Sequence, residues 1–156
     1  MHINELVEEA GTNSRDHGFH EDWPAPGYPI VTATGLPASD VPKEWIEGHK
    51  VELRRAITEK LALIHEEISE ALGEIRSGHA PDKVYYSVKG GMVFDDQQFD
   101  AEGKPTLKPE GFGIELADAA IRIADLAYLL NLDLSELVRE KAEYNRTRPY
   151  KHGRKF

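Results

Sequence analysis

The chain has 156 residues, no cysteine, and 28 acidic against 19 basic side chains, which gives a formal charge of −9. The lack of cysteine excludes a disulfide framework, a thiolate metal site and a cysteine nucleophile, and the acidity disfavours nonspecific nucleic-acid binding by the whole surface. No apolar run reaches the ~18 residues of a membrane span, and the first ten residues carry three glutamates where a signal peptide needs basic and then apolar residues. We therefore expect one cytosolic domain over residues 1–156, without a membrane partner.

The first predicted element is a short helix, followed by an irregular arm. Apolar side chains recur at helical spacing at Ile3, Leu6, Val7 and Ala10, and the pattern fades over residues 11–18. Five prolines between Trp23 and Pro42 then exclude a long helix, so this segment is expected to be an extended arm or loop.

A long amphipathic helix is predicted next, over Val51–Arg76. No proline interrupts the segment, and Ser77, Gly78 and Pro81 mark its end. Its apolar side chains recur at three- and four-residue steps at Leu53, Ile57, Leu61, Ile64, Ile68, Leu72 and Ile75.

The segment 77–111 reads as an insert between the two strongest helices. Strand-forming residues over 84–88, a Gly90-Gly91 turn and a return over Met92–Phe94 predict a small β-hairpin. The polar remainder, Asp95–Gly111, is expected to be loop.

Two further helices are predicted in the C-terminal part. The first covers Gly113–Leu130, and the second begins after Asp133, an N-cap residue with Glu136 three positions on, and stops before Pro149. A basic tail, 147–156, closes the chain. The predicted fold is therefore all-α, with a four- or five-helix bundle-like core and a small β-hairpin insert.

Pairs of acidic residues on the two strong helices are the main candidates for a functional site. Glu67 and Glu70 are three residues apart, as are Glu115 and Asp118, so each pair projects from one helix face. Such a pair is most often solvated, but these acids border apolar stripes and only Asp118 has a cation, Arg122, four residues on. Facing antiparallel helices would bring the carboxylates together, and carboxylates beside a core need a cation. Oxygen ligands favour Mg²⁺, with Mn²⁺ as an alternative.

The order of these motifs resembles that of the MazG-like, all-α nucleotide pyrophosphohydrolases. That family carries Glu-x-x-Glu on one helix, Glu-x-x-Asp on the next, and a Lys and an Asn on the last helix. The matching residues here are Glu67 and Glu70, Glu115 and Asp118, and Lys141 and Asn145, within Arg54–Arg76 and Phe112–Phe156. The resemblance covers about half of the chain, and the 77–111 insert makes the link between the acidic helices longer than the family pattern.

The resemblance implies a site and a reaction. It implies Mg²⁺-dependent hydrolysis of a nucleoside triphosphate between the α and β phosphates, as in nucleotide-pool house-cleaning, by a homodimer or homotetramer. Glu67 or Glu70 would be the general base, and Lys141 and Asn145 would contact the phosphates and sugar, with Arg146 or Arg148 as further contacts. The implied metal ligands are Glu67, Glu70, Glu115 and Asp118.

Other interpretations stay open at this point. The substrate could be of the phosphoribosyl-ATP type, or the chain could be a non-catalytic helical module that binds a metal or a basic partner. A P-loop is excluded because no Gly-x-x-x-x-Gly-Lys-Ser/Thr motif is present.

Several side chains outside the acidic motifs also have two interpretations each. His17 and His20 are either half of a metal site or surface and substrate-contacting residues, and Tyr85 and Tyr86 either pack the hairpin or line a neighbouring subunit's pocket. The basic tail is disordered, folds over the acidic face or contacts nucleotide. A base-stacking platform or ordinary packing is open for the aromatic side chains Phe19, Trp23, Tyr28 and Trp45.

Overall fold

The computed structural model describes residues 2–24, 43–88 and 91–149. Residues 25–42 of the expected arm, with Tyr28, the Gly90 turn position and residues 150–156 of the tail lie outside this description. The described residues form four helices and one three-stranded sheet, so the expected mainly helical class with a small β insert is confirmed. None of the described helices combines the length and apolarity needed to cross a bilayer.

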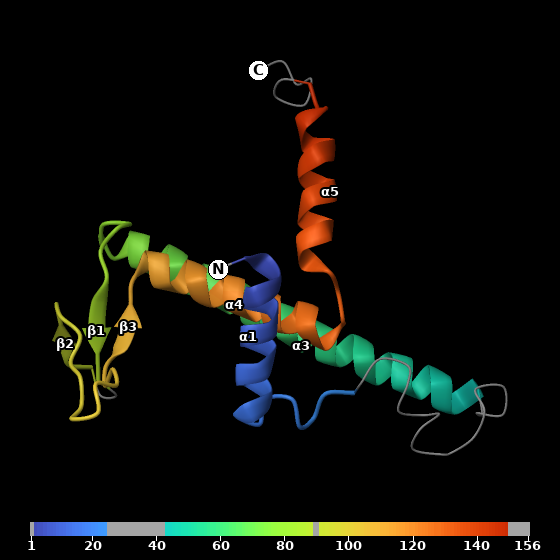
Figure 1. The fold of residues 1–156 in the computed structure, drawn as a ribbon, viewed down its shortest axis with the longest axis horizontal. Coiled ribbons are helices and arrows are strands. Elements are labelled where there is room, and N and C mark those ends of the chain that lie inside the picture. The colour runs from blue at the N-terminus through green and yellow to red at the C-terminus, as the bar shows by residue number, and fades with distance from the viewer. Residues whose placement is uncertain (1, 25–42, 89–90, 150–156) are drawn as a thin grey trace.

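Four helices carry the architecture (Figure 1). The helices α3 and α4 pack side by side and antiparallel, and α1 lies across α4. The last helix, α5, leaves the end of α4 and projects away from the α3–α4 pair, with α1 as its neighbour. The helix bounds are α1 Ile3–Asp16, α3 Lys43–Arg76, α4 Phe112–Leu129 and α5 Leu134–Arg146.

The insert contains one strand more than the sequence predicts. Strands β1 (Tyr85–Ser87) and β2 (Val93–Phe94) form the expected antiparallel hairpin, with Tyr86 opposite Phe94. The third strand, β3 (Lys108–Glu110), pairs antiparallel with the other edge of β1, so the expectation that residues 95–111 are all loop is wrong. The sequence Lys-Pro-Glu has no strand-forming residue, and its pairing with β1 comes from tertiary contact.

Helix ends agree with the sequence pattern except at two places. Asp133 caps α5 as expected, with its side chain accepting a hydrogen bond from the Glu136 backbone N–H at 3.0 Å. The helix α3 begins at Lys43 rather than Val51, and α1 continues to Asp16 although its apolar spacing ends at Ala10. Both extensions lack an apolar periodicity in the sequence, which explains why the pattern missed them.

A small core joins α1 to α4. It consists of Val7 and Ala10 on α1 and Ala124 and Ala127 on α4. Alanines allow the two helices to approach closely, and Gly11 extends this contact because a Cβ built there would lie 2.0 Å from the Tyr128 ring.

The helix α3 covers its apolar stripe only in part, since Leu53, Ile57 and Ile64 are half-buried. Glu67 and Ala71 are the buried residues of this helix. Four residues of the predicted stripe are instead at least 40% exposed in this chain: Leu61, Ile68, Leu72 and Ile75. The expectation that the acids merely border a buried stripe is therefore wrong for α3, since an acid itself occupies the contact with α4.

Candidate metal centre

Three of the four predicted carboxylates converge between α3 and α4. Each of Glu67, Glu70 and Glu115 offers one oxygen, and these oxygens all lie within 4.8 Å of one another. We call these three residues the carboxylate cluster. Asp118, one turn further along α4, is not among the three, but its carboxylate lies close enough to Glu67 for the two charges to repel each other. The convergence follows from two i, i+3 pairs on antiparallel helices that face each other.

Glu115 is the most perturbed member of the carboxylate cluster. Only 3% of the residue is exposed, and its Oε2 atom is buried without a hydrogen-bond partner among the described residues. Burial, followed by repulsion from Glu70, raises the pKa of Glu115 to about 7. Burial and the Glu67 charge also raise the pKa of Asp118.

Arg122 partly compensates the acidic charge. Its Nε atom donates to Glu67 Oε1 at 2.5 Å, across the helix interface. The sequence predicts Arg122 as the partner of Asp118, one turn away on the same helix. The charge of Arg122 does lower the pKa of Asp118, but the hydrogen bond of Arg122 goes to Glu67 on α3. One arginine leaves the carboxylate cluster with an excess of negative charge.

These residues fit a hard divalent cation. All donors of the carboxylate cluster are carboxylate oxygens, which Mg²⁺ and Mn²⁺ prefer. The orphaned buried oxygen of Glu115 is costly without a partner, and a cation would supply one.

A pocket of about 470 Å³ adjoins this centre. Asp118 and Arg122 form part of its wall, and the segment after α1 contributes Phe19 and Trp23. The apolar part of its lining also includes Ala56, Leu63 and Ile121. The pocket therefore combines flat aromatic and aliphatic surface with charged groups at the edge of the acidic site.

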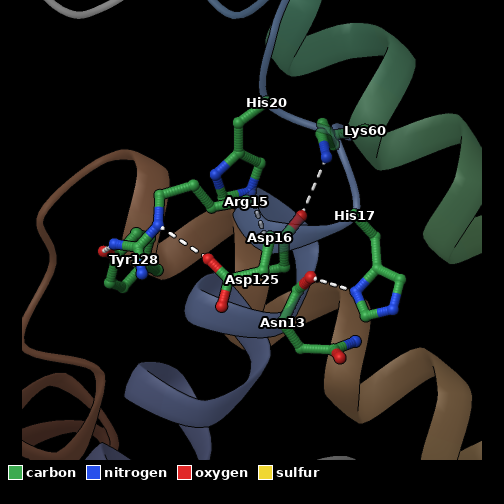
Figure 2. Close-up of polar contacts among 8 residues, drawn as sticks. All are labelled: Asn13, Arg15, Asp16, His17, His20, Lys60, Asp125 and Tyr128. Carbon is green, nitrogen blue, oxygen red and sulfur yellow. Dashed lines mark hydrogen bonds and ion pairs between the residues drawn. The ribbon is translucent and has the colours of Figure 1, made fainter.

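A buried ionic contact around Asp125 holds the pocket wall in place (Figure 2). Its Oδ1 atom lies 2.7 Å from His20 Nε2 and its Oδ2 atom accepts a hydrogen bond from Lys60 Nζ at 2.8 Å. We call these three residues the Asp125 clamp. It ties α4, α3 and the segment after α1 together.

The two candidate histidines do not share a site. The ring of His20 contacts Asp125, whereas His17 Nδ1 lies 2.8 Å from the Asn13 backbone oxygen (Figure 2). These separate partners give no support to a histidine metal site.

The predicted substrate residues near the end of the chain are not brought to the carboxylate cluster. Lys141 and Asn145 lie on α5, which projects away from α3 and α4 (Figure 1). The Lys141 ammonium lies 4.9 Å from the ring centroid of Tyr144, and the Arg148 guanidinium lies 6.0 Å from the same centroid. Arg146 is the last residue of α5, so all four predicted substrate residues lie on this helix or just after it, and not at the carboxylate cluster.

No sequence motif assigns a role to Lys60 or Lys108, and His20 is predicted as a candidate without its contact to Asp125. Lys60 lies seven residues before Glu67, two helical turns along the same face, and this spacing could have identified it. His20 and Lys108 reach the site only through tertiary contacts. Glu74, which extends the acidic row of α3, accepts hydrogen bonds from Tyr85 Oη at 2.9 Å and pairs with His79 at 2.6 Å, and so anchors the insert.

Comparisons with known proteins identify no relative that would assign a function to this site. The chain matches no family model, and searches of curated proteins and of solved structures returned no significant match. The assignment of function therefore depends on the residues and contacts described above.

Proposed function

We propose that this protein is a Mg²⁺-dependent hydrolase that cleaves a nucleoside triphosphate between its α and β phosphates, giving the monophosphate and pyrophosphate. The observation that carries the proposal is the carboxylate cluster, in which three carboxylates converge and one buried oxygen has no described partner. The ordered motifs that resemble the MazG-like pyrophosphohydrolases supply the reaction class. Nucleotide-pool house-cleaning is the corresponding biological role.

The chain's own residues divide into holding and proton-accepting roles. Glu67, Glu70 and Glu115 would hold the metal, with Asp118 completing the set. A bound Mg²⁺ would neutralise phosphate charge and lower the pKa of an attacking water. Because each carboxylate offers the metal one oxygen, its second oxygen could accept the proton of the water. Glu70 is the better candidate for this general base, because Glu67 already accepts a hydrogen bond from Arg122 and no described residue donates one to the exposed Glu70.

The pocket beside Asp118 is suited to the nucleoside end of the substrate. With the phosphates at the carboxylates, the base and sugar would extend toward Phe19 and Trp23. Aromatic faces stack on nucleobases without a need for hydrogen bonding, so this wall supports nucleotide binding and leaves the base preference to its finer shape.

A second copy of the chain would complete this site. The exposed apolar stripe on α3 supports a dimer or tetramer, because large apolar patches mark association surfaces. In such an assembly Lys141, Asn145, Arg146 and Arg148 would reach the phosphates and sugar from the α5 of a neighbouring subunit.

Two measurements on matched variants test the proposal. Glu70→Ala and Asp118→Ala should each abolish Mg²⁺-dependent pyrophosphate release while leaving helicity nearly unchanged. Glu66→Ala, which removes an exposed glutamate next to the motif, is the control and should keep the activity. Retained activity in both test variants would overturn the site assignment.

Nucleotide binding separates the enzyme from a binding module. Calorimetry should find that nucleotide binding requires Mg²⁺ and is lost in Lys141→Ala. Nucleotide-independent binding of a basic partner, without either dependence, would favour the non-catalytic module.

A further inference from the structure

The strand that the sequence missed leads directly into the acidic helix. β3 ends at Glu110 and α4 begins at Phe112, with Glu115 in its first turn. The residue between them, Gly111, has φ 121°, and a Cβ there would lie 2.4 Å from the Lys83 carbonyl oxygen. Glycine is therefore required at this link, where β3 passes directly into the first turn of α4 and contacts that helix.

Lys108 lies on this strand, and its ammonium group is held in place by a short chain of contacts. Lys108 Nζ donates to Glu110 Oε2 at 2.9 Å, and Glu110 Oε1 accepts a hydrogen bond from Ser87 Oγ at 2.7 Å. Ser87 is paired with Lys108 in the sheet, so both strands fix Glu110. The Lys108 side chain remains 59% exposed and can therefore meet a ligand from solvent.

The Lys108 ammonium is within electrostatic reach of the metal centre. Its strand β3 contacts α4, which carries Glu115 and Asp118. The Lys108 charge lowers the pKa of both carboxyls against the larger effect of burial, the Glu110 carboxylate raises both, and the Glu70 carboxylate acts on Lys108 in turn. The other two described cations at the site are already held by buried carboxylates, Arg122 by Glu67 and Lys60 by Asp125. Lys108 differs from them because its partner belongs to its own strand and the ammonium faces solvent.

We propose that Lys108 binds phosphate oxygens of the substrate at the metal centre, so that the insert supplies a phosphate ligand from the same chain. A triphosphate with one Mg²⁺ retains net negative charge, and an ammonium beside the carboxylates is placed to offset it. The identity of the substrate rests on the proposed function, whereas the phosphate site itself can be tested with inorganic pyrophosphate.

The test is calorimetry on wild-type protein, Lys108→Gln and the control Lys104→Gln, which removes a lysine four residues upstream on the same insert. Each protein is titrated with Mg²⁺ alone and then with pyrophosphate at saturating Mg²⁺. Lys108→Gln should bind Mg²⁺ at least as tightly as wild type, because a repelling charge is gone, and should bind pyrophosphate about tenfold more weakly. Lys104→Gln should change neither affinity, and Lys108→Arg should restore most of the pyrophosphate affinity.

Three outcomes overturn the proposal. The first is an unchanged pyrophosphate affinity in Lys108→Gln. The second is a parallel loss of Mg²⁺ and pyrophosphate affinity in that variant, which would indicate a structural role. The third is no pyrophosphate binding by the Mg²⁺-loaded wild-type protein. A selective loss of pyrophosphate affinity together with no turnover of any nucleoside triphosphate would support the phosphate site and refute the proposed reaction.

Discussion

Glu115 combines burial, a like-charged neighbour and an orphaned oxygen. Each of these disfavours its ionised form, and together they hold its pKa at about 7. In an isolated helix pair such a residue only costs stability. A cation that binds there would reverse the effect, since it favours the ionised form.

The unfolding free energy of the metal-free protein should fall as the pH rises from about 5 to 8. The folded state binds the Glu115 proton more tightly than the unfolded chain, whose glutamate pKa is near 4.5, so the stabilisation present at low pH is lost as pH passes through about 7. Asp118 acts in the same direction. Urea unfolding at several pH values measures this slope. Glu115→Gln should flatten it, and an identical slope in that variant would contradict the account.

Mg²⁺ affinity should rise over the same pH range. The metal competes with the Glu115 proton, so binding tightens as the pH passes through about 7 and the proton no longer has to be displaced. Calorimetry in buffers of different ionisation enthalpy would detect the released proton. An affinity independent of pH between 6 and 8 would exclude Glu115 as a ligand.

The contact between α1 and α4 depends on a glycine, Gly11, which has no side chain. Gly11→Ala should lower the unfolding free energy by about 1–3 kcal/mol, because the new Cβ would overlap the Tyr128 ring and force the helices apart. Gly73→Ala on α3 is the matched control, since nothing lies within 4 Å of its Cβ position and alanine is the better helix former by roughly 1 kcal/mol. Urea denaturation compares the two, and equal effects would refute the close contact.

The Asp125 clamp is the second contact that joins elements. Asp125→Asn should lower the unfolding free energy by about 2–3 kcal/mol, because Lys60 would keep a partly buried charge without a carboxylate. Asp16→Asn removes an exposed ion pair with Arg15 and should change stability by less than about 1 kcal/mol. Thermal and urea unfolding of both variants would decide, and similar small effects would show that the clamp contributes little.

An element can be predicted from the sequence when the residues that determine it lie within that element. Apolar spacing, prolines and an N-cap identified α3, α4 and α5, apart from the first eight residues of α3, because these causes lie within each helix. The acidic pairs were found for the same reason. The roles of His20, Asp125 and Lys108, and the strand β3, depend on which distant segments meet, and no local spacing encodes that.

The apolar stripe of α3 is the feature of the whole molecule that this chain alone leaves unexplained. Leu61 and Ile68 are each 48% exposed and Leu72 is 55% exposed. Glu67, next to Ile68 in the sequence, is instead buried at the contact with α4. A periodic apolar face that a single chain leaves exposed is expected to pack against another copy.

Light scattering should therefore give a mass of at least twice the 17.5 kDa of one chain. Leu72→Asp should shift the protein toward the monomer, because a charge in an apolar interface is poorly solvated. Met92→Asp, at an exposed apolar position on the insert, is the control and should leave the mass unchanged. A monomeric wild-type protein would contradict both the dimer and the supply of α5 residues by a neighbouring subunit.

Product analysis would show which phosphate bond the protein cleaves. Pyrophosphate and orthophosphate release would be measured from a panel of deoxy- and ribonucleoside triphosphates, with Mg²⁺ and with EDTA. Cleavage between the α and β phosphates should give Mg²⁺-dependent pyrophosphate from one or a few members, with no orthophosphate, and no product in EDTA. Orthophosphate as the product would place the cleavage at a different bond, and no release from any member would contradict the proposed triphosphate hydrolysis.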